Sequence, residues 1–137
     1  MTAPGVVVAV DVGTVRVGVA ASDPHRVLAS PVETVPAPGH ERVVEIVAER
    51  DAVLVVVGLP TSLSGRATSA SADMARSYAA ALQARLDVPV QLEDERLTTV
   101  AAAQALRASG KRGKEARGVV DQAAAVALLQ GFLDRRG

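Results

Sequence analysis

Runs of apolar residues along the chain predict a sheet that begins with paired strands. The first run, Val6–Ala20, is rich in valine and is interrupted by Asp11 and then by Gly13 before valines resume. Continuous apolar runs are typical of strands buried on both faces of a sheet, and a glycine permits a tight reversal of the backbone. The stretch therefore predicts two strands joined by a hairpin, with Asp11 near the end of the first strand.

The pattern then adds one more strand before helices and strands alternate. A third extended run, Val27–Val35, contains Pro31, which favours an edge position in a sheet. The later predicted elements are helices at His40–Arg50, Ala67–Leu86, Val100–Ala108 and Val119–Leu133, and strands at Ala52–Val57 and Val88–Glu93. Ser109–Gly118, with three glycines, is expected to be a mobile loop. This order predicts an α/β fold with a mixed five-stranded sheet, an antiparallel meander of strands 1–3 followed by parallel strands, flanked by helices.

Composition narrows the classes of protein to which the chain can belong. Its 137 residues are enough for one domain with a substantial core, so residues 1–137 are expected to form a single domain. The absence of cysteine excludes disulfides and thiolate metal sites. No apolar run reaches the roughly 18 residues of a membrane span, and no signal peptide is recognised, so a cytoplasmic protein is expected. The formal net charge of zero neither favours nor opposes nucleic-acid binding.

Carboxylates recur at the ends of predicted elements. Asp11 is near the end of the first strand, Asp94 and Glu95 follow the fifth, and Asp121 lies in the first turn of the predicted last helix. Ligand sites of α/β sheets lie beyond the carboxyl ends of strands, so these acids can converge there. Converging carboxylates repel one another unless a cation lies between them, and all-oxygen ligation favours Mg²⁺ or Mn²⁺. Two such ions could clamp a phosphodiester for hydrolysis.

Each of these acids also has a structural interpretation. Asp11 could cap the turn, Asp121 could complement the positive end of its helix, and Glu95 could form a surface pair with Arg96. Asp94 continues the period-two face of the fifth strand, whereas Glu95 lies on the opposite face, so both cannot point inward from a regular strand. The residue pattern leaves open which of the two does.

Four motifs in order resemble one known family. They are D-x-G-T-x-R-x-G-V-A at Asp11–Ala20, V-G-L-P at Val57–Pro60 with Gly65 beyond it, D-E-R-L-T-T at Asp94–Thr99, and D-Q-A-A-A-x-x-L-L-Q at Asp121–Gln130. Together they resemble the YqgF/RuvX family across nearly the whole chain. The resemblance implies an RNase H-like fold and a nuclease that either matures the 5′ end of pre-16S ribosomal RNA or resolves Holliday junctions.

The resemblance also implies roles for particular residues. Asp11, Glu95 and Asp121 would be the catalytic, metal-binding acids, with Asp94 as the alternative to Glu95 and Mg²⁺ or Mn²⁺ as the cofactor. Resolvases of the related RuvC group are expected to carry further acids where this chain has Gly58 and Ala124. The absence of these acids makes junction resolution doubtful and favours the RNA-processing role. The implied partners are pre-rRNA or branched DNA, with ribosomal precursor particles and a second copy of the chain as further options and no membrane.

Basic residues gather just before Asp121. Arg107, Lys111, Arg112, Lys114 and Arg117 fall within eleven residues and are opposed only by Glu115. Such a segment can contact phosphates without reading sequence, and its alternative is a solvated loop. Arg16 and Arg96 lie beside the acids and could steady a phosphate or form structural ion pairs.

Two rival functions follow from the same residues. The chain could be a non-catalytic RNA-binding module that has kept the fold. Alternatively, D-x-G-T-x-x-x-G resembles the phosphate loop of actin-like and sugar-kinase ATPases, although those proteins use two duplicated domains and this chain has no second copy of the motif.

Overall fold

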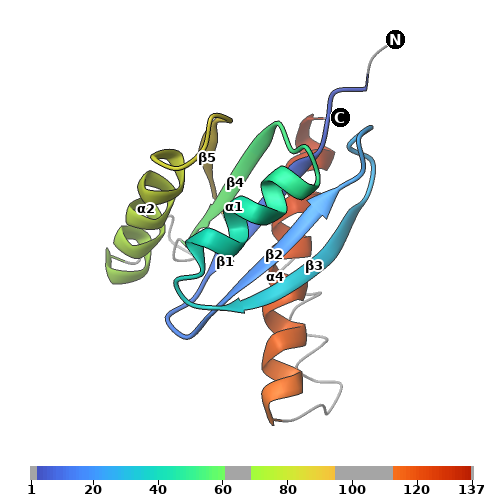
Figure 1. Cartoon of the computed structure of the whole chain (residues 1–137). Coiled ribbons are helices and arrows are strands. Elements are labelled where there is room, and N and C mark those ends of the chain that lie inside the picture. The colour runs from blue at the N-terminus through green and yellow to red at the C-terminus, as the bar shows by residue number, and fades with distance from the viewer. Residues whose placement is uncertain (1–2, 61–68, 95–112, 137) are drawn as a thin grey trace.

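The computed structural model describes residues 3–60, 69–94 and 113–136 of the chain. Its strands are β1 (Val7–Val12), β2 (Arg16–Ser22), β3 (Ala29–Pro36), β4 (Leu54–Leu59) and β5 (Val90–Asp94). Its helices are α1 (His40–Glu49), α2 (Ser69–Gln83) and α4 (Gly113–Arg136), as Figure 1 shows. The predicted helix at Val100–Ala108 lies outside the described residues.

The strands form one mixed sheet in the order β3-β2-β1-β4-β5. The pairs β1–β2 and β2–β3 are antiparallel, and the pairs β1–β4 and β4–β5 are parallel. This confirms the predicted antiparallel meander followed by parallel strands. It also confirms that the proline-containing third strand lies at an edge, where the missing N–H of Pro31 removes least from the sheet.

Helices cover the two faces of the sheet unequally. The first face packs on α1 and α2, whose buried residues include Val43, Ile46 and Leu82. The second face packs on α4 through Leu128 and Phe132 among others. In Figure 1, α1 lies in front of the sheet and α4 lies behind it. No helix in the described part of the chain is long and apolar enough to cross a membrane.

The third strand begins two residues later than predicted because a side chain competes for its backbone. The Asp23 carboxylate accepts hydrogen bonds from the N–H groups of His25, Val27 and Leu28 at 2.8 to 3.1 Å. These bonds lower the pKa of Asp23, that from Leu28 most. Val27 and Leu28 are thereby held in a turn and are exposed, rather than forming part of β3.

The last helix begins earlier than predicted. The expectation of a mobile loop through Gly118 is wrong from Gly113 onward, because α4 begins at Gly113. Between the two glycines lie Lys, Glu, Ala and Arg, which rank among the better helix formers, so the residues between Gly113 and Gly118 are compatible with the helix. Residues 109–112 of the expected loop lie outside the described residues.

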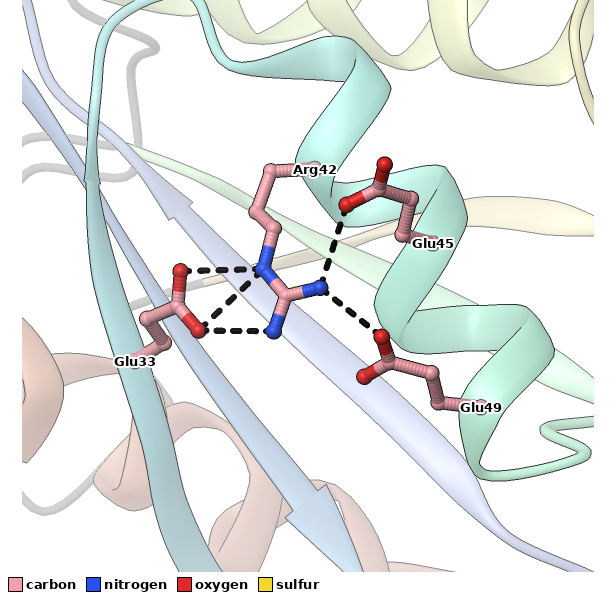
Figure 2. Close-up of polar contacts among 4 residues, drawn as sticks. All are labelled: Glu33, Arg42, Glu45 and Glu49. Carbon is pink, nitrogen blue, oxygen red and sulfur yellow. Dashed lines mark hydrogen bonds and ion pairs between the residues drawn. The ribbon is translucent and has the colours of Figure 1, made fainter.

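A charged cluster joins α1 to the edge strand β3 (Figure 2). The Arg42 guanidinium donates to Glu33 of β3 at 2.9 Å and to Glu45 and Glu49 of its own helix at 3.1 and 2.9 Å. The hydrogen bond from Arg42 lowers the pKa of Glu33, and the three carboxylates raise the pKa of Arg42. The cluster therefore links α1 to β3, on the face of the sheet away from α4.

Candidate metal centre and nucleic-acid interface

Asp11 lies near the end of the central strand, one residue before its last residue Val12, as predicted. The four preceding residues, Val7–Val10, are completely buried, and Asp11 itself is half-buried. Strand β1 is held on both sides, by β2 and by β4, so the backbone that carries Asp11 is fixed by two ladders of hydrogen bonds. A half-buried carboxylate on so rigid a strand can be presented to a ligand with little loss of conformational entropy.

A tight hairpin follows Asp11 and depends on Gly13. The N–H of Gly13 donates to the carbonyl of Arg16, the first residue of β2, at 3.0 Å. A Cβ atom added to Gly13 would lie 2.5 Å from that carbonyl oxygen, closer than real Cβ atoms approach. The Gly in the D-x-G-T motif is therefore needed to close the hairpin directly beside Asp11.

The strands on either side of Asp11 carry glycine at its level. Across the antiparallel pair, Asp11 lies opposite Gly18. Across the parallel pair, Val10 lies beside Val57, so Gly58 is the next residue of β4 at the level of Asp11. Positions at one level on neighbouring strands share a face of the sheet. Neither of these two neighbouring positions therefore carries a side chain beyond Cα next to Asp11.

Asp11 belongs to the face that α4 covers. Val8 and Val10 pack in the core with α1 and α2, whereas Val7 and Ala9 pack in the core with α4. Because side chains alternate along a strand, Asp11 shares the face of Val7 and Ala9. The carboxylate predicted to bind metal therefore lies on the α4 side of the sheet.

Asp94, in the fifth strand, lies on the opposite face of the sheet from Asp11. Val90 and Leu92 pack against the core that α1 and α2 cover, so alternation places Asp94 on that face, opposite to Asp11. Glu93 has the other parity and pairs with Gly58, so it lies on the face of Asp11. Glu95 and Arg96 lie outside the described residues.

Glu93 is not among the residues predicted from the sequence. Its side chain is 14% exposed and forms an ion pair with Arg135 in the last turn of α4. Alternation along the fifth strand was the available signal, because it places residue 93 on the face opposite to Val90 and Leu92. The partner Arg135, 42 residues away along the chain, had no such local signal.

Residue 121 lies farther into the last helix than predicted. The expectation that Asp121 occupies the first turn is wrong, because α4 begins eight residues before it, at Gly113. Its interpretation as a partner of the helix dipole therefore loses its basis, since that effect is confined to the first turn. Residue 121 precedes Ala125 and Leu128, both buried against the sheet, by four and seven residues, the spacing of one helix face. The side chain of Asp121 lies outside what the structure describes.

The predicted basic residues are divided between described and undescribed parts of the chain. Positions 114 and 117 belong to the first turns of α4, although the side chains of Lys114 and Arg117 are outside the description. Lys111 and Arg112 lie outside the described residues, as does Arg107. Arg16 begins β2 directly after the hairpin and is half-buried. Figure 1 shows the start of α4 extending past the end of the sheet at which β1 turns into β2.

Of the predicted metal centre, the structure thus describes the side chain of Asp11 and the backbone position of residue 121. Within the described residues, no three His, Asp or Glu side chains are grouped closely enough to hold a metal ion. Glu95 and the Asp121 side chain, the other two predicted ligands, are not among those residues. A half-buried carboxylate with glycines beside it fits a hard cation such as Mg²⁺ or Mn²⁺, which takes oxygen ligands.

Comparison with known proteins adds evidence on family and fold. A family model described as "RuvX: Holliday junction resolvase" matches residues 5–135. A Rhodococcus opacus protein named "putative pre-16S rRNA nuclease" is 51% identical, over 94% of this chain and 77% of the relative. Proteins of the same name from Corynebacterium glutamicum and Mycolicibacterium paratuberculosis are 52% and 54% identical, over 97% and 93% of this chain and 80% and 78% of theirs.

Solved structures support the same architecture. Thermus thermophilus RuvC in complex with a Holliday junction substrate superposes with a TM-score of 0.58 at 19% identity, covering 97% of this chain and 96% of RuvC. A second T. thermophilus RuvC structure gives a TM-score of 0.55 at 20% identity, with 96% of each chain covered. At such low identity the likeness concerns the fold, and it confirms the RNase H-like fold that the motifs implied.

Proposed function

Because the chain belongs to the RuvX family, we propose that it is a metal-dependent nuclease that hydrolyses phosphodiester bonds in structured nucleic acid. The specific activity that we propose is maturation of the 5′ end of pre-16S ribosomal RNA. The relatives at 51% to 54% identity are named for this RNA. The observation that carries the proposal is the placement of Asp11, half-buried at the end of the central strand between two glycine positions.

Three acids would hold the metal. Asp11 of β1, Glu95, the next residue in the sequence after β5, and Asp121 of α4 would supply the ligand oxygens. The parity of β5 supports Glu95 over Asp94, because Asp94 lies on the face opposite to Asp11. The spacing of residue 121 from Ala125 and Leu128 supports a place on the same side of the sheet as Asp11.

The chemistry would be hydrolysis without a covalent enzyme intermediate. When bound, a pair of Mg²⁺ or Mn²⁺ ions would supply Lewis-acid chemistry, activating the attacking water and stabilising charge on the leaving oxygen. The water oxygen forms a bond to phosphorus while one P–O bond breaks, which leaves a phosphate on one fragment and a hydroxyl on the other. The role of this chain is to hold the acids and to align the phosphate for attack.

Basic residues would bind the substrate through its phosphates. Lys111, Arg112, Lys114 and Arg117 precede Asp121, and Arg16 and Arg96 adjoin the acids at positions 11 and 95. Lys and Arg contacts to phosphate give affinity that depends on salt and little on sequence. With Tyr78 and Phe132 as the only aromatic residues, and both buried, stacking on bases contributes little.

Holliday junction resolution is the second candidate, favoured by the description of the matching family model. Two positions weaken it. Gly58 adjoins Asp11 and Ala124 lies in α4, where the RuvC group is expected to carry acids. With those ligands absent, the RNA substrate is the better supported of the two.

The test compares wild type with Asp11→Asn on a pre-16S RNA fragment and on a four-way DNA junction, each with Mn²⁺. Loss of outer-sphere partners costs metal sites about 10–100-fold, so loss of a ligand should reduce the cleavage rate by more than about 100-fold. Glu41→Gln, which neutralises an exposed acid on α1, is the matched control and should cleave like wild type.

The relative cleavage of the two substrates distinguishes the two candidate functions. Preferential cleavage of RNA supports the first proposal, and preferential cleavage of the junction supports the second. Equal cleavage by wild type and Asp11→Asn would remove Asp11 from the site, and absence of cleavage together with RNA binding would indicate the non-catalytic module. Tight binding of ATP with Mg²⁺, measured by titration calorimetry, would instead support the ATPase alternative.

A further inference from the structure

A pocket opens beside the hairpin that follows Asp11. Its volume is about 300 Å³, at the lower end of the range for small-ligand sites. Three parts of the chain form its walls, namely the β1–β2 hairpin, the connection from β3 to α1, and α2. The lining residues are Val12, Gly13, Thr14, Ala37, Pro38, Met74 and Tyr78. None of these residues is charged, so the pocket suits an uncharged, largely apolar group rather than a phosphate.

Hydrogen bonds join the walls of this pocket to one another. The N–H of Ala37 donates to the carbonyl of Val15 in the hairpin at 2.9 Å. The hydroxyl of Tyr78 in α2 donates to the carbonyl of Pro38 at 2.6 Å. The hairpin, the connection and α2 are therefore linked in series. A ligand would enter a pocket that is already formed, which lowers the entropic cost of binding.

The pocket lies at the same end of β1 as Asp11 but on the other face of the sheet. Val12, which lines the pocket, packs against the core that α1 and α2 cover, whereas Asp11 shares the face of α4. The two residues are neighbours in the chain, so their Cα atoms are about 3.8 Å apart. Between the two faces lies the hairpin tip, where Thr14 and Val15 are exposed. A nucleic-acid strand that crosses this tip can therefore contact Asp11 and the pocket together.

The bases are the uncharged and comparatively apolar parts of such a strand. A stacked strand carries one phosphate per about 3.4 Å of its axis, so a base adjoining a phosphate at Asp11 is within reach of the pocket. Proteins commonly hold bases that are free of a duplex among apolar and aromatic side chains. Met74 and Pro38 supply the apolar surface here, because Tyr78 is only 5% exposed. The hydroxyl of Thr14 can hydrogen-bond to the edge of a base.

We propose that this pocket receives an unpaired base of the substrate strand, next to the phosphate at which Asp11 acts. This inference rests on the proposed function and specifies its substrate as a strand with an unpaired nucleotide beside the cut. A base within a duplex would first have to leave its stack and its partner, which costs energy. The pocket thereby makes cleavage selective for the structure around the cut.

The first experiment removes single bases around the cut in a pre-16S RNA fragment and measures cleavage by the full chain with Mn²⁺. An abasic nucleotide keeps its sugar and phosphate but cannot fill the pocket. We expect the wild-type rate to fall by about 10-fold or more when the base at one position beside the cut is missing, and to change little elsewhere. Pairing that nucleotide with a complementary strand should lower the rate similarly.

The second experiment tests whether this loss depends on the pocket. Ala37→Leu fills part of the pocket and should lower the rate on intact RNA by about 10-fold, from the lost contribution of one base. On RNA that lacks the sensitive base, Ala37→Leu should cleave like wild type. Ala80→Leu, the same change at an exposed position of α2, is the matched control and should cleave both RNAs like wild type. If Ala37→Leu does not fold, Met74→Ala, which removes apolar surface from the wall, is compared in the same way.

Several results would overturn the inference. A wild-type scan with no sensitive position would show that no base is bound. A wild-type rate for Ala37→Leu on intact RNA would show that the pocket is not used, and equal losses on intact and abasic RNA would show a structural effect. Low-micromolar affinity for free adenosine monophosphate, measured by calorimetry, would make the pocket a mononucleotide site.

Failure of the proposed function looks different. Wild type would then cleave neither the intact RNA nor any abasic RNA, which removes both proposals. Wild type that cleaves all of these RNAs at one rate contradicts the base pocket only. Preferential cleavage of a fully paired four-way junction also contradicts the need for an unpaired base and leaves nuclease activity standing.

Discussion

On one face of the sheet, α1 and α2 together cover a core that includes Ile46 and Leu82; on the other, α4 covers a smoother surface that includes Ala9. The first face neutralises its strand carboxylate Glu33 with Arg42 at an exposed edge. The second face presents Asp11 in the middle of the sheet, between glycine positions. The first face thus pairs its strand carboxylate with a cation, whereas the second carries the acid that we propose as a metal ligand, with glycines on both neighbouring strands.

This contrast suggests that similar damage on the two faces should have different consequences. A change on the α1–α2 face should lower the free energy of unfolding and leave the proposed metal site of the folded protein intact. A change on the α4 face should lower stability and also disturb the placement of the proposed ligand on α4. Three pairs of substitutions, in addition to those of the proposed metal site, test the contrast.

The largest expected effect comes from truncating one core residue on each face. Phe132→Ala and Leu82→Ala should each lower the free energy of unfolding by about 2–5 kcal/mol, because both side chains are fully buried or nearly so. Mn²⁺ affinity below the unfolding temperature should fall only in Phe132→Ala, since that residue holds α4. Urea unfolding and calorimetry provide the two readouts, and equal Mn²⁺ affinity in the two variants would contradict the division of roles.

A smaller effect is expected from Gly13→Ala at the hairpin beside Asp11. The added Cβ would lie 2.5 Å from the Arg16 carbonyl, so the backbone must shift, at a cost of about 1–3 kcal/mol by analogy with overpacked sites. Cleavage should fall more than stability suggests, because the shift occurs two residues from Asp11. Gly39→Ala is the control: its Cβ would lie 2.7 Å from a Val35 methyl and its φ is +59°, but it lies beside α1. Comparable loss of cleavage in both variants would mean that neither hairpin geometry nor proximity to Asp11 matters.

The smallest effect is a pH dependence confined to the α1–α2 face. His40 begins α1, its ring lies 4.3 Å from that of Tyr78, and its buried Nε2 has no hydrogen-bond partner among the described residues. Burial, and to a lesser degree the charge of Arg85, lowers the pKa of His40 below 6.5. The unfolded chain therefore binds the proton more readily, so the contribution to stability is present above about pH 6.5 and is lost as the pH falls below it.

Measuring unfolding between pH 7.5 and 5 tests this sign. His40→Phe should flatten the fall in stability toward acid pH, whereas His25→Gln, in the exposed turn after Asp23, should leave the slope as it is. A steeper fall in His40→Phe would show that the imidazole is stabilised by protonation, contrary to its buried, unpaired nitrogen.

Local patterns predicted much of this fold. The hairpin at Gly13, the alternation of later helices and strands, and the edge position of the strand with Pro31 were all readable, because each depends on burial or turn chemistry within a few residues. The prediction for the start of α4 was wrong. Glycines at 113 and 118 are typical of a loop, whereas the residues between them favour a helix. The predicted roles of Glu95, Asp121, Arg96, Lys111, Arg112, Lys114 and Arg117 stay predictions, since these side chains lie outside the described residues. The role of Arg16, whose side chain is described, also stays a prediction.

By itself, the sequence determined that Asp11 lies near the end of a buried strand and shortly before a turn, since apolar periodicity and glycine are properties of neighbouring residues. Only the tertiary structure decided that Asp11 shares a face with α4, that Asp94 lies on the other face, and that Glu93 meets Arg135. Alternation along a strand divides its residues into two sets, but the helix that covers each set is decided by strand pairing and crossovers between residues far apart in the chain.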